Sequence, residues 1–490
     1  MELPGARYFR TPRFGFGQGL GFGGPQTQTR LFCQVACLDG SPPGEILGIM
    51  VSVENGGHTR RKRQWRPVQH GLWRLWAQVC SVGRPRMSSD NDIWITGIGA
   101  ASPLGSGIEQ ITDAVLQGKT SIQPIDHFDT TTHASKIASH LSTIPDCPWP
   151  SDPTVPPTGR LIESCSWQAL KNADWKPSNG KLGLALGLGP DWMLSWEATW
   201  HPPAAGTLER NGQPYPAYTD LIMRHWKGSI GPTTQVSSAC ASGNHALVLG
   251  ASMLLGGAAD AVLAGAAAVN TTPLTMSVFG NLRATSRRND DPARACRPFD
   301  RDRDGFVMGD GGAIFVLEKA GKAKARGAKP LALLAGWGMT SDAHHLVMPS
   351  TDQTHVIMAM RQAIERAAIA PGELGYINAH APGTPAGDAM EAQAIRTLAE
   401  ETEINAPVSS TKGATGHLLA AAASLELAMG VICMQRQLVP ATLNLETIDP
   451  ACEGIEHILG HARPSPLRWV LSNAFGFGGS NCSVAIRSAT

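Results

Sequence analysis

One short pattern occurs twice in this chain, and the repeat constrains the fold more than any other feature. VSSAC at positions 236–240 and VSSTK at positions 408–412 lie 172 residues apart (412 − 240), and the same offset places His245 over His417. In each copy a β-rich segment leads through small residues into a run of Leu and Ala, a pattern typical of a strand, a tight turn and a buried helix. We therefore predict two copies of one α/β unit.

The segments around the repeat also favour an α/β fold. From Ile93 onward, stretches of helical character alternate with short β-rich runs: IWITGIG, LGLALGLG, AVLAGAAAV, GAIFVLE, LALLAGWGM, GYINAH and WVLSNAF. Such alternation predicts sheets layered with helices. We expect the halves to span 87–328 and 329–490, divided near 327–330 where a Lys/Ala-rich helical stretch ends, with their functional ends meeting at a pseudo-dyad.

The first 86 residues differ in charge from the rest of the chain. They hold 12 Lys and Arg against 4 Asp and Glu, a net charge of +8, whereas the remaining residues hold 29 against 36, a net charge of −7. This basic composition has two functional interpretations. One is an organelle transit peptide, and the other is a nucleic-acid-binding or nuclear-import patch around 60–66. We favour a third, in which residues 1–86 are a basic extension that is disordered or lies upstream of a true start at Met87.

The cysteine usage and the long uncharged run argue against several classes of protein. Ten cysteines in 490 residues, with no CxxC pair, do not form a disulfide framework or a zinc motif, so we expect a cytoplasmic location and no metal. Cys33 and Cys37 have no matching cluster of ligands. The uncharged run at 228–259 is broken by glycine, which indicates a core helix rather than a membrane span. We expect neither a membrane nor a nucleic acid as partner.

Two further motifs resemble ligand-binding loops. DRDRDG at 300–305 begins like an EF-hand, but the twelfth position of that loop is Gly311 instead of Glu, so we do not expect calcium. The glycines of LGLALGLGP at 182–190 lack the GK[ST] of a phosphate-binding loop, which favours a buried strand.

Cys240 is the candidate nucleophile. It lies at or just before the first turn of its predicted helix, where backbone N–H groups and the helix dipole are expected to lower the pKa of a thiol. The small residues ASGN that follow leave room for a thioester to approach. Four other cysteines are expected to be small buried hydrophobes: Cys165, Cys296, Cys433 and Cys452.

Two histidines are candidate partners for this thiol. His380 ends the β-rich run GYINAH, and side chains at that end of a strand face the cleft of many α/β proteins. His417 is expected one turn into the second helix of the repeat, in an apolar setting that keeps it neutral. A thiol with two neutral imidazoles suits acyl transfer followed by stabilisation of an enolate. Glu391 and Glu426 are the candidate counter-ions of Lys412.

Several motifs in this order resemble the β-ketoacyl-acyl-carrier-protein synthases of the elongating I/II type, which have the thiolase fold. The matching segments are SACASGN, NAH…GTPAGD, KGATGH, GFGGSN and RPFDRDRDGFVMGDGGAIFVLE, and the resemblance runs from about 93 to 486. It implies duplicated α/β halves in five α-β-α-β-α layers. It also implies a homodimer, with substrates carried on the phosphopantetheine of acyl carrier protein and no bound cofactor.

The resemblance implies a role for each matched residue. Cys240 accepts the acyl chain from the carrier protein. His380 and His417 help malonyl-carrier protein to lose carbon dioxide and hold the enolate oxygen, and the carbanion then extends the acyl chain by two carbons. The backbone N–H groups of Cys240 and Phe477 form the oxyanion hole.

Supporting roles follow from the same resemblance. Lys412 acts electrostatically on the histidines, together with Glu391 or Glu426. Phe477 and Gly478 belong to a loop that gates the pocket.

The acyl pocket and the carrier-protein surface are implied by other positions. Phe279 resembles a residue of the acyl tunnel. The basic residues expected to meet the acidic carrier protein are Arg283, Arg287 and Arg288, for which a solvated basic loop is the alternative interpretation.

Two positions depart from the family. Pro382 and Val347 stand where threonine, or at the second position serine, is common, and only Thr384 is retained. Both positions ordinarily help to bind pantetheine, so two hydroxyl contacts are expected to be missing. The alternative function is a non-catalytic partner of a ketosynthase that sets chain length. The retained catalytic candidates argue against it, namely Cys240, His380, Lys412 and His417. The sequence leaves open the acyl chain itself, and also whether the product is a fatty acid or a polyene, polyketide or other specialised lipid.

Overall fold

The structure is a computed structural model that describes residues 6–8, 30–38, 48–54, 90–150, 155–190 and 217–489. The chain divides into two compact units, 1–86 and 87–490. In the first unit an antiparallel sheet has the order β1 (Ala6–Tyr8), β2 (Arg30–Leu38), β3 (Gly48–Glu54). Met87 and the basic run at 60–66 lie outside the described residues, so the interpretation of the first 86 residues stays a prediction.

The second unit is built on an 11-stranded sheet with the order β15-β14-β18-β19-β13-β4-β12-β10-β8-β9, in which β5 pairs with β4. Its strands are β4 (Ile93–Ser102), β5 (Gly105–Ser106), β8 (Leu182–Gly187), β9 (Ile230–Val236), β10 (Ala261–Ala268), β12 (Gly311–Lys319), β13 (Ala332–Ser341), β14 (Leu374–Asn378), β15 (Val408–Ser409), β18 (Trp469–Gly476) and β19 (Ser480–Ser488). All seven β-rich runs identified in the sequence form strands, which confirms those predictions.

The order of the strands reveals the duplication directly. In chain order the five long strands of the first half are β4, β8, β9, β10 and β12, and the corresponding strands of the second half are β13, β14, β15, β18 and β19. Both sets are arranged 3-2-4-5-1 across the sheet, and the first strands of the two sets, β4 and β13, pair with each other. The second set begins at β13, just after helix α8 (Ala320–Ala325). The repeated α/β unit predicted from the VSSAC and VSSTK motifs is therefore confirmed.

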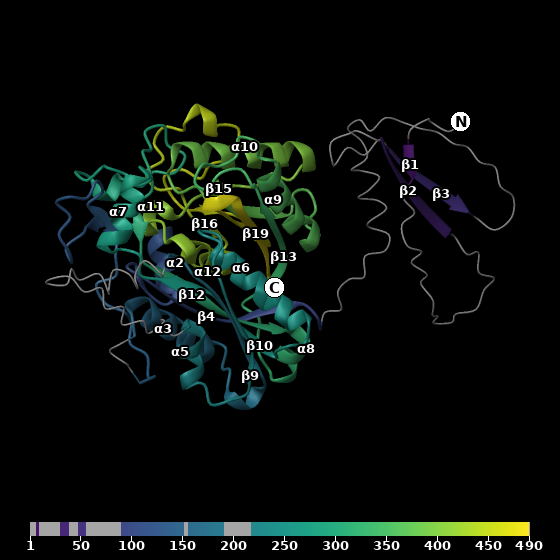
Figure 1. Cartoon of the computed structure of the whole chain (residues 1–490), viewed down its shortest axis with the longest axis horizontal. Helices are drawn as coiled ribbons and strands as arrows, with labels where there is room; N and C mark the ends of the chain where they lie inside the picture. Colours follow the sequence, from purple (N-terminus) through teal and green to yellow (C-terminus); the bar gives the residue numbers. More distant parts are fainter. Residues whose placement is uncertain are drawn as a thin grey trace, which may run out of the picture. The chain divides into compact units, whose positions relative to one another are not determined.

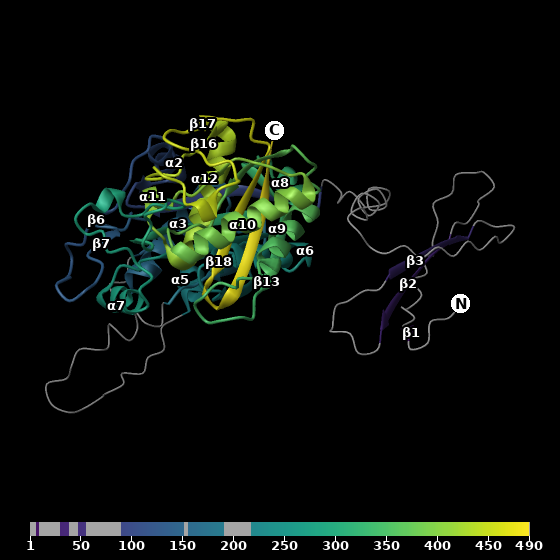
Figure 2. The ribbon, with the colours of Figure 1, turned by 90° about the horizontal axis from the view of Figure 1, so that it is seen from above.

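Helices cover both outer faces and fill the space between the two halves of the sheet (Figures 1 and 2). On one outside, α3 (Pro157–Asn172) packs on β4, β10 and β12, and α5 (Tyr218–His225) packs on α3. On the other, α9 (Thr354–Ala367) packs on β13 and β19, and α10 (Pro385–Thr402) packs on α9.

The central layer contains α6 (Ser242–Leu255) and α12 (Ala422–Arg436), which contact each other. Helix α12 packs on β12 of one half and on β18 of the other, and α2 (Ile108–Leu116) packs against it. The five α-β-α-β-α layers expected from the sequence are thus confirmed.

Glycines allow the outer helices to approach the sheet closely at equivalent places in both halves. A Cβ on Gly99 of β4 would lie 2.0 Å from the carbonyl oxygen of Cys165 in α3. A Cβ on Gly338 of β13 would lie 2.0 Å from the carbonyl oxygen of Ala359 in α9. Because real Cβ atoms do not approach an oxygen so closely, both helix–strand contacts require glycine.

Among the described residues one helical stretch, Leu419–Arg436, is long and apolar enough to cross a membrane, but 89% of it is buried inside the protein. A helix that is apolar on all sides is expected wherever protein surrounds it. Its place between the two halves of the sheet explains its composition, and we assign it to the core.

The remaining short elements border the region of the candidate site. A small sheet has the order β11 (Met308–Gly309), β7 (Ile137–Ser139), β6 (Gln123–Pro124), and a two-stranded sheet pairs β16 (Leu438–Val439) with β17 (Arg463–Pro464). Helix α7 (Pro273–Asn281) follows β10, and the one-turn helix α11 (Lys412–Thr415) follows β15.

Candidate active site

The three candidate catalytic side chains come from segments that follow strands. Cys240 lies between β9 and α6, and Ala239 before it has φ 48°, a left-handed conformation that is uncommon for a residue other than glycine. His380 follows β14, and His417 follows α11. All three are buried, with exposed fractions of 8%, 7% and 2%.

These side chains form one compact group. Nε2 of His417 lies 3.2 Å from Sγ of Cys240, within hydrogen-bonding distance for sulfur. The rings of His380 and His417 meet edge to face, with their centroids 5.2 Å apart. The sulfur and one nitrogen of each ring all lie within 4.8 Å of one another. The structure thus brings together the thiol and the two imidazoles that the sequence singled out.

The position of His417 differs from the expectation. It does not lie one turn into the second repeat's long helix, because α12 begins only at Ala422. Gly416, with φ 68°, ends α11, and the next residue runs extended: the N–H of His417 donates to Val307 and its carbonyl accepts from Gly309. The second copy therefore inserts a separate helical turn between strand and helix, which shifts the two copies out of register.

Both histidines are held in the neutral form. Burial lowers the pKa of His417 well below 6.5, and the nearby charge of Lys412 lowers it further. Burial, followed by Lys412 and then His417, lowers the pKa of His380 in the same way. The direction of the shift agrees with the neutral state expected for His417 from its apolar sequence context, and the pKa of His380 is shifted in the same direction.

The expectation for the thiol pKa was wrong in direction. Burial raises the pKa of Cys240 to about 11. The N–H of Phe477, the charge of Lys412 and the N–H of Cys240 itself oppose this shift without overcoming it. The start of a helix supplies N–H groups, but desolvation of a thiolate in so buried a place outweighs them. The resting group is a neutral thiol, with His417 positioned to take its proton.

The two candidate counter-ions of Lys412 have different partners. Nζ of Lys412 lies 2.5 Å from Oε1 of Glu426, and both side chains are buried. Glu391 instead accepts hydrogen bonds from the N–H groups of His380 and Ala381, at 2.9 and 2.6 Å. Glu426 thus balances the charge of Lys412, while Glu391 fixes the backbone that carries His380.

The turn between β18 and β19 closes over the thiol. A Cβ on Gly476 would lie 3.0 Å from the backbone nitrogen of Cys240, which shows how closely the turn approaches. Gly478 has φ 80°, and its N–H donates to the carbonyl of Leu346 at 2.8 Å. The ring of Phe477 lies 6.2 Å, centroid to centroid, from that of Phe279. Of the two expected gating residues, Phe477 therefore lies beside the nucleophile, whereas Gly478 ties the turn to the segment at Leu346.

Two cavities reach Cys240. The first, of about 260 Å³, is lined by both histidines and by residues assigned from the sequence, namely Phe279, Arg283, Val347, Pro382, Thr384 and Phe477. The second, of about 210 Å³, shares Cys240, Phe279 and Phe477 and extends along Pro190 and Leu419. Both departures from the family pattern, Pro382 and Val347, thus face the same cavity.

The three basic residues assigned to the carrier surface are not equivalent. Arg283 is exposed and lines the first cavity. Arg288 donates to the carbonyl of Asp302 at 2.6 Å, and the N–H of Arg287 donates to Asp304 at 3.0 Å. Of the three, Arg283 alone lines either cavity.

A buried carboxylate that the sequence analysis did not single out, Asp388, organises the loop after His380. It accepts hydrogen bonds from the N–H groups of Gly383 and Thr384, and burial raises its pKa to about 7. Arg303 lies 3.8 Å from Asp388 and donates to the carbonyls of Thr384 and Pro385, at 3.2 and 2.7 Å. Asp388 and Arg303, which we call the clamp, therefore hold the backbone of the loop that lines the cavity.

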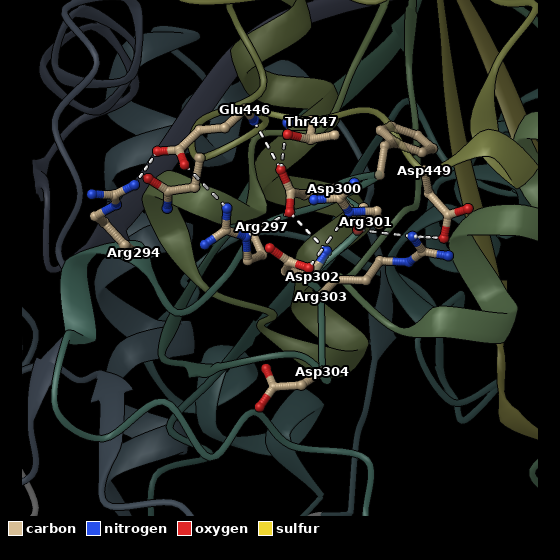
Figure 3. Close-up of polar contacts among 12 residues, drawn as sticks. Arg294, Arg297, Asp300, Arg301, Asp302, Arg303, Asp304, Glu446, Thr447 and Asp449 are labelled. Carbon is tan, nitrogen blue, oxygen red and sulfur yellow. Dashed lines mark hydrogen bonds and ion pairs between the residues drawn. The ribbon is translucent and has the colours of Figure 1, made fainter.

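Arg303 of the clamp belongs to the DRDRDG segment (Figure 3). The carboxylate of Asp300 accepts from Arg297 and from the N–H groups of Glu446 and Thr447. Burial alone would raise its pKa, but these donors lower it to about 2. Arg303 also pairs with Asp449 at 2.6 Å. The alternation of Asp and Arg in DRDRDG is the sequence feature from which a buried network of ion pairs could have been predicted.

Comparisons with known proteins agree with this geometry. The family model described as "Beta-ketoacyl synthase, N-terminal domain" matches residues 90–323, and "Beta-ketoacyl synthase, C-terminal domain" matches 331–446. The chain is 36% identical over 414 residues to the 3-oxoacyl-[acyl-carrier-protein] synthase 2 of Vibrio harveyi, covering 81% of this chain and 99% of the relative.

Two solved structures are similar over the same share of the chain. A β-ketoacyl synthase from Burkholderia phymatum is 32% identical with a TM-score of 0.71, covering 81% of this chain and 99% of the other. A ketosynthase solved in complex with the acyl carrier protein of a type II polyketide synthase is 25% identical with a TM-score of 0.73 and the same coverage.

Proposed function

The chain belongs to the β-ketoacyl synthase family, and we propose that it is a 3-oxoacyl-[acyl-carrier-protein] synthase that lengthens a carrier-bound acyl chain by two carbons. Its five layers are those of the thiolase fold. The observation that carries the proposal is the 3.2 Å contact between the Cys240 thiol and Nε2 of a neutral His417, with the ring of His380 beside it. A thiol with two imidazoles at a cavity serves decarboxylative condensation.

In the first half-reaction Cys240 accepts the acyl chain. As its proton passes to His417, the sulfur attacks the carbonyl carbon of the acyl thioester. The negative oxygen that forms is held by the N–H groups of Cys240 and Phe477, both of which lie close enough to the sulfur to lower the thiol pKa. Collapse of this intermediate expels the pantetheine thiolate, which takes the proton from His417, and the enzyme is left as an acyl thioester.

In the second half-reaction the histidines act on malonyl-carrier protein. Once Cys240 is acylated its sulfur no longer offers a proton to Nε2 of His417. The neutral ring then shifts its own proton from Nδ1 to Nε2, and Nε2 donates to the thioester oxygen of the malonyl group. A neutral imidazole is a hydrogen-bond donor, and His380 supplies the second one. The carbon–carbon bond to the carboxylate breaks, carbon dioxide leaves and the enolate forms. The enolate carbon then attacks the acyl–Cys240 carbonyl and expels the Cys240 thiolate. This thiolate takes one proton from solvent, which restores the neutral thiol and balances the loss of carbon dioxide.

The two cavities separate the two ends of the substrate. We assign the second cavity, bounded by Phe279, Pro190 and Leu419, to the acyl chain, and the first cavity to the pantetheine arm. Arg283 at the first cavity is the residue placed to meet an acidic carrier protein. The complex described for a similar ketosynthase supports acyl carrier protein as the partner class.

A homodimer is supported by one edge of the main sheet. Strand β9 pairs with β8 on one side, and no other described strand pairs with its second side. Its residues contain no charge, and Ile230 is 51% exposed. An uncharged edge strand of seven residues tends to pair with another strand, and a second copy of this chain offers one. We expect Ile230→Asp to convert a dimer into a monomer in sedimentation; a monomeric parent would contradict the dimer.

The activity is tested with acyl- and malonyl-carrier protein. We expect the full chain to release carbon dioxide and to form a carrier-bound 3-oxoacyl product that is two carbons longer. Cys240→Gln should abolish condensation but retain decarboxylation of malonyl-carrier protein, because both histidines remain. Loss of both activities in a folded Cys240→Gln protein would contradict the roles given to His380 and His417. The cytoplasmic location stays a prediction.

A further inference from the structure

Three potential metal ligands meet away from the catalytic cavities, at the ends of strands β6 and β7. Asp126 and His127 lie two and three residues after the end of β6, and His140 is the first residue after β7. The side chain of His140 is 1% exposed, whereas those of His127 and Asp126 are 43% and 81% exposed. The group therefore has a buried end and a solvent-facing end, and none of its members lines either cavity at Cys240.

The donor atoms of this group converge. Nε2 of His140 lies 3.5 Å from Oδ1 of Asp126, and Nδ1 of His127 lies 3.8 Å from the same oxygen. One donor atom of each residue lies within 4.8 Å of the others. Ligands about 2.1 Å from a tetrahedral zinc ion are separated by roughly 3.4 Å. The two contacts of Asp126 are already close to this spacing, and rotation of the partly exposed His127 ring toward His140 closes the site.

The ring of His127 is already oriented for coordination. Its Nε2 lies 3.0 Å from the carbonyl oxygen of Thr271, which accepts only from a protonated nitrogen. In the neutral ring the proton is therefore on Nε2, and the lone pair is on Nδ1, the atom that faces Asp126 and His140. A backbone carbonyl that fixes the tautomer of a ligating histidine is a common outer partner in metal sites. Figure 2 shows β6 and β7 beside α7, the helix that follows Thr271.

The buried ring of His140 has no short hydrogen bond. Its Nε2 lies 3.3 Å from both Nε2 of Gln123 and the carbonyl oxygen of Pro124, and its Nδ1 has no partner in the structure. Binding of a metal ion at Nε2 therefore requires the ring proton to move to Nδ1, which gives up the long contact with Pro124. A half-turn of the Gln123 amide would place an oxygen where its nitrogen stands, which offers a fourth ligand. Full burial without a strong partner is costly for an imidazole, and a metal ion at Nε2 would relieve part of that cost.

We propose that Asp126, His127 and His140 bind a divalent transition-metal ion of the zinc class. Two imidazoles and one carboxylate suit Zn²⁺, whereas Mg²⁺ and Ca²⁺ prefer oxygen ligands alone. The ion would stabilise a junction of the core, because Asp310 accepts from the N–H of Leu141, next to His140, and from the N–H of Thr271.

The test is zinc binding to the full chain in a Cys240→Ser background, because the catalytic Cys240, His380 and His417 also lie within 4.8 Å of one another and compete for the ion. After dialysis against a fixed low concentration of free Zn²⁺, bound zinc is counted by elemental analysis and the melting temperature is measured. We expect His127→Gln and Asp126→Asn to remove one zinc equivalent per chain and to abolish the rise in melting temperature that zinc causes in the parent. Both residues are partly or largely exposed, so the variants should fold.

The exposed His461 provides the matched control. We expect His461→Gln to bind as much zinc as the parent and to keep the full rise in melting temperature. Zinc bound elsewhere in the chain is common to all variants and cancels from the difference. Equal zinc binding by the parent, His127→Gln and Asp126→Asn would overturn the proposal, as would an equal loss in His461→Gln. Condensing activity is not a readout, so the outcome is independent of the proposed function.

Discussion

Lys412 and Glu426 form an ion pair that is closed to solvent, with Nζ 2.5 Å from Oε1 and side chains 0% and 2% exposed. Lys412 follows β15 in the second half of the fold, just as Cys240 follows β9 in the first half. The ion pair therefore lies in the segment of the second half that corresponds to the nucleophile segment. The same charge contributes to the low pKa of both histidines. Removing the charge of Lys412 should therefore change both the stability of the fold and the rate of the reaction that the histidines support.

We expect Lys412→Met to lower the free energy of unfolding by about 3–5 kcal/mol, because it leaves a buried carboxylate without a partner. The double variant Lys412→Met/Glu426→Leu removes both charges and should recover most of that stability. It should still decarboxylate malonyl-carrier protein more slowly than the parent, because the lysine no longer acts on the histidines. Chemical denaturation and the decarboxylation rate check both parts. A double variant as unstable as the single one would contradict the pairing.

The neutral state of His417 gives a pH dependence of stability with a definite sign. Its pKa in the folded protein lies well below 6.5, its ordinary value, so below that pH the unfolded chain binds a proton that the folded protein does not. Stability is thus lost as the pH falls, by at most about 1.4 kcal/mol per pH unit for this group. We expect His417→Gln to show a shallower loss than the parent between pH 6.5 and 5. An unchanged slope in denaturation experiments would contradict a neutral buried His417.

The clamp behind the cavity predicts a contrast between two neighbouring arginines. Arg303 is buried and holds the carbonyls of Thr384 and Pro385, whereas the side chain of Arg301 is 61% exposed. We expect Arg303→Met to lower the free energy of unfolding by about 2–4 kcal/mol. It should also raise the KM for malonyl-carrier protein, because Thr384 and Pro385 line the first cavity. Arg301→Met should change neither quantity appreciably. Equal effects of the two substitutions in steady-state kinetics would contradict a specific clamp.

The close contact between β13 and α9 predicts a stability effect outside the site. Gly338→Ala places a methyl group against the carbonyl of Ala359, so α9 must move away from the sheet, and we expect a loss of about 1–3 kcal/mol or more. Gly280→Ala in α7 is the matched control, because its nearest new contact is an ordinary 3.8 Å to Ala134. It should be neutral or slightly stabilising. Thermal unfolding distinguishes the two, and similar melting temperatures for both variants would count against the packing described.

Much of the architecture could be predicted from the sequence because it depends on local patterns. Apolar runs such as AVLAGAAAV form strands buried on both faces, and the paired VSSAC and VSSTK motifs mark equivalent points of the two halves. The nucleophile could be found in the same way, since Cys240 falls between a strand and a helix whatever the details of packing.

Other features depend on residues that are distant in the chain and could not be predicted from short sequence patterns. The thiol pKa depends on how much of the chain covers Cys240, and burial reversed the expected direction. The offset of 172 residues between the two copies predicts a helical position for His417. That prediction fails because the second copy contains an additional short helix, α11, before its long helix. Asp388 was missed because the partners that reveal its role, Arg303 and the N–H of Phe299, come from a segment more than 80 positions earlier in the chain (85 and 89), although Gly383 and Thr384 are near it in the sequence.

The most direct test of the account is the chemical state of Cys240 after exposure to acyl-carrier protein in the absence of malonyl-carrier protein. Intact-mass measurement followed by peptide mapping should find one acyl group per chain, located on the peptide that contains Cys240. Addition of malonyl-carrier protein should then remove it as the product forms. A folded protein that makes product while Cys240 never carries the acyl group, or that carries it on another cysteine, would contradict the central claim.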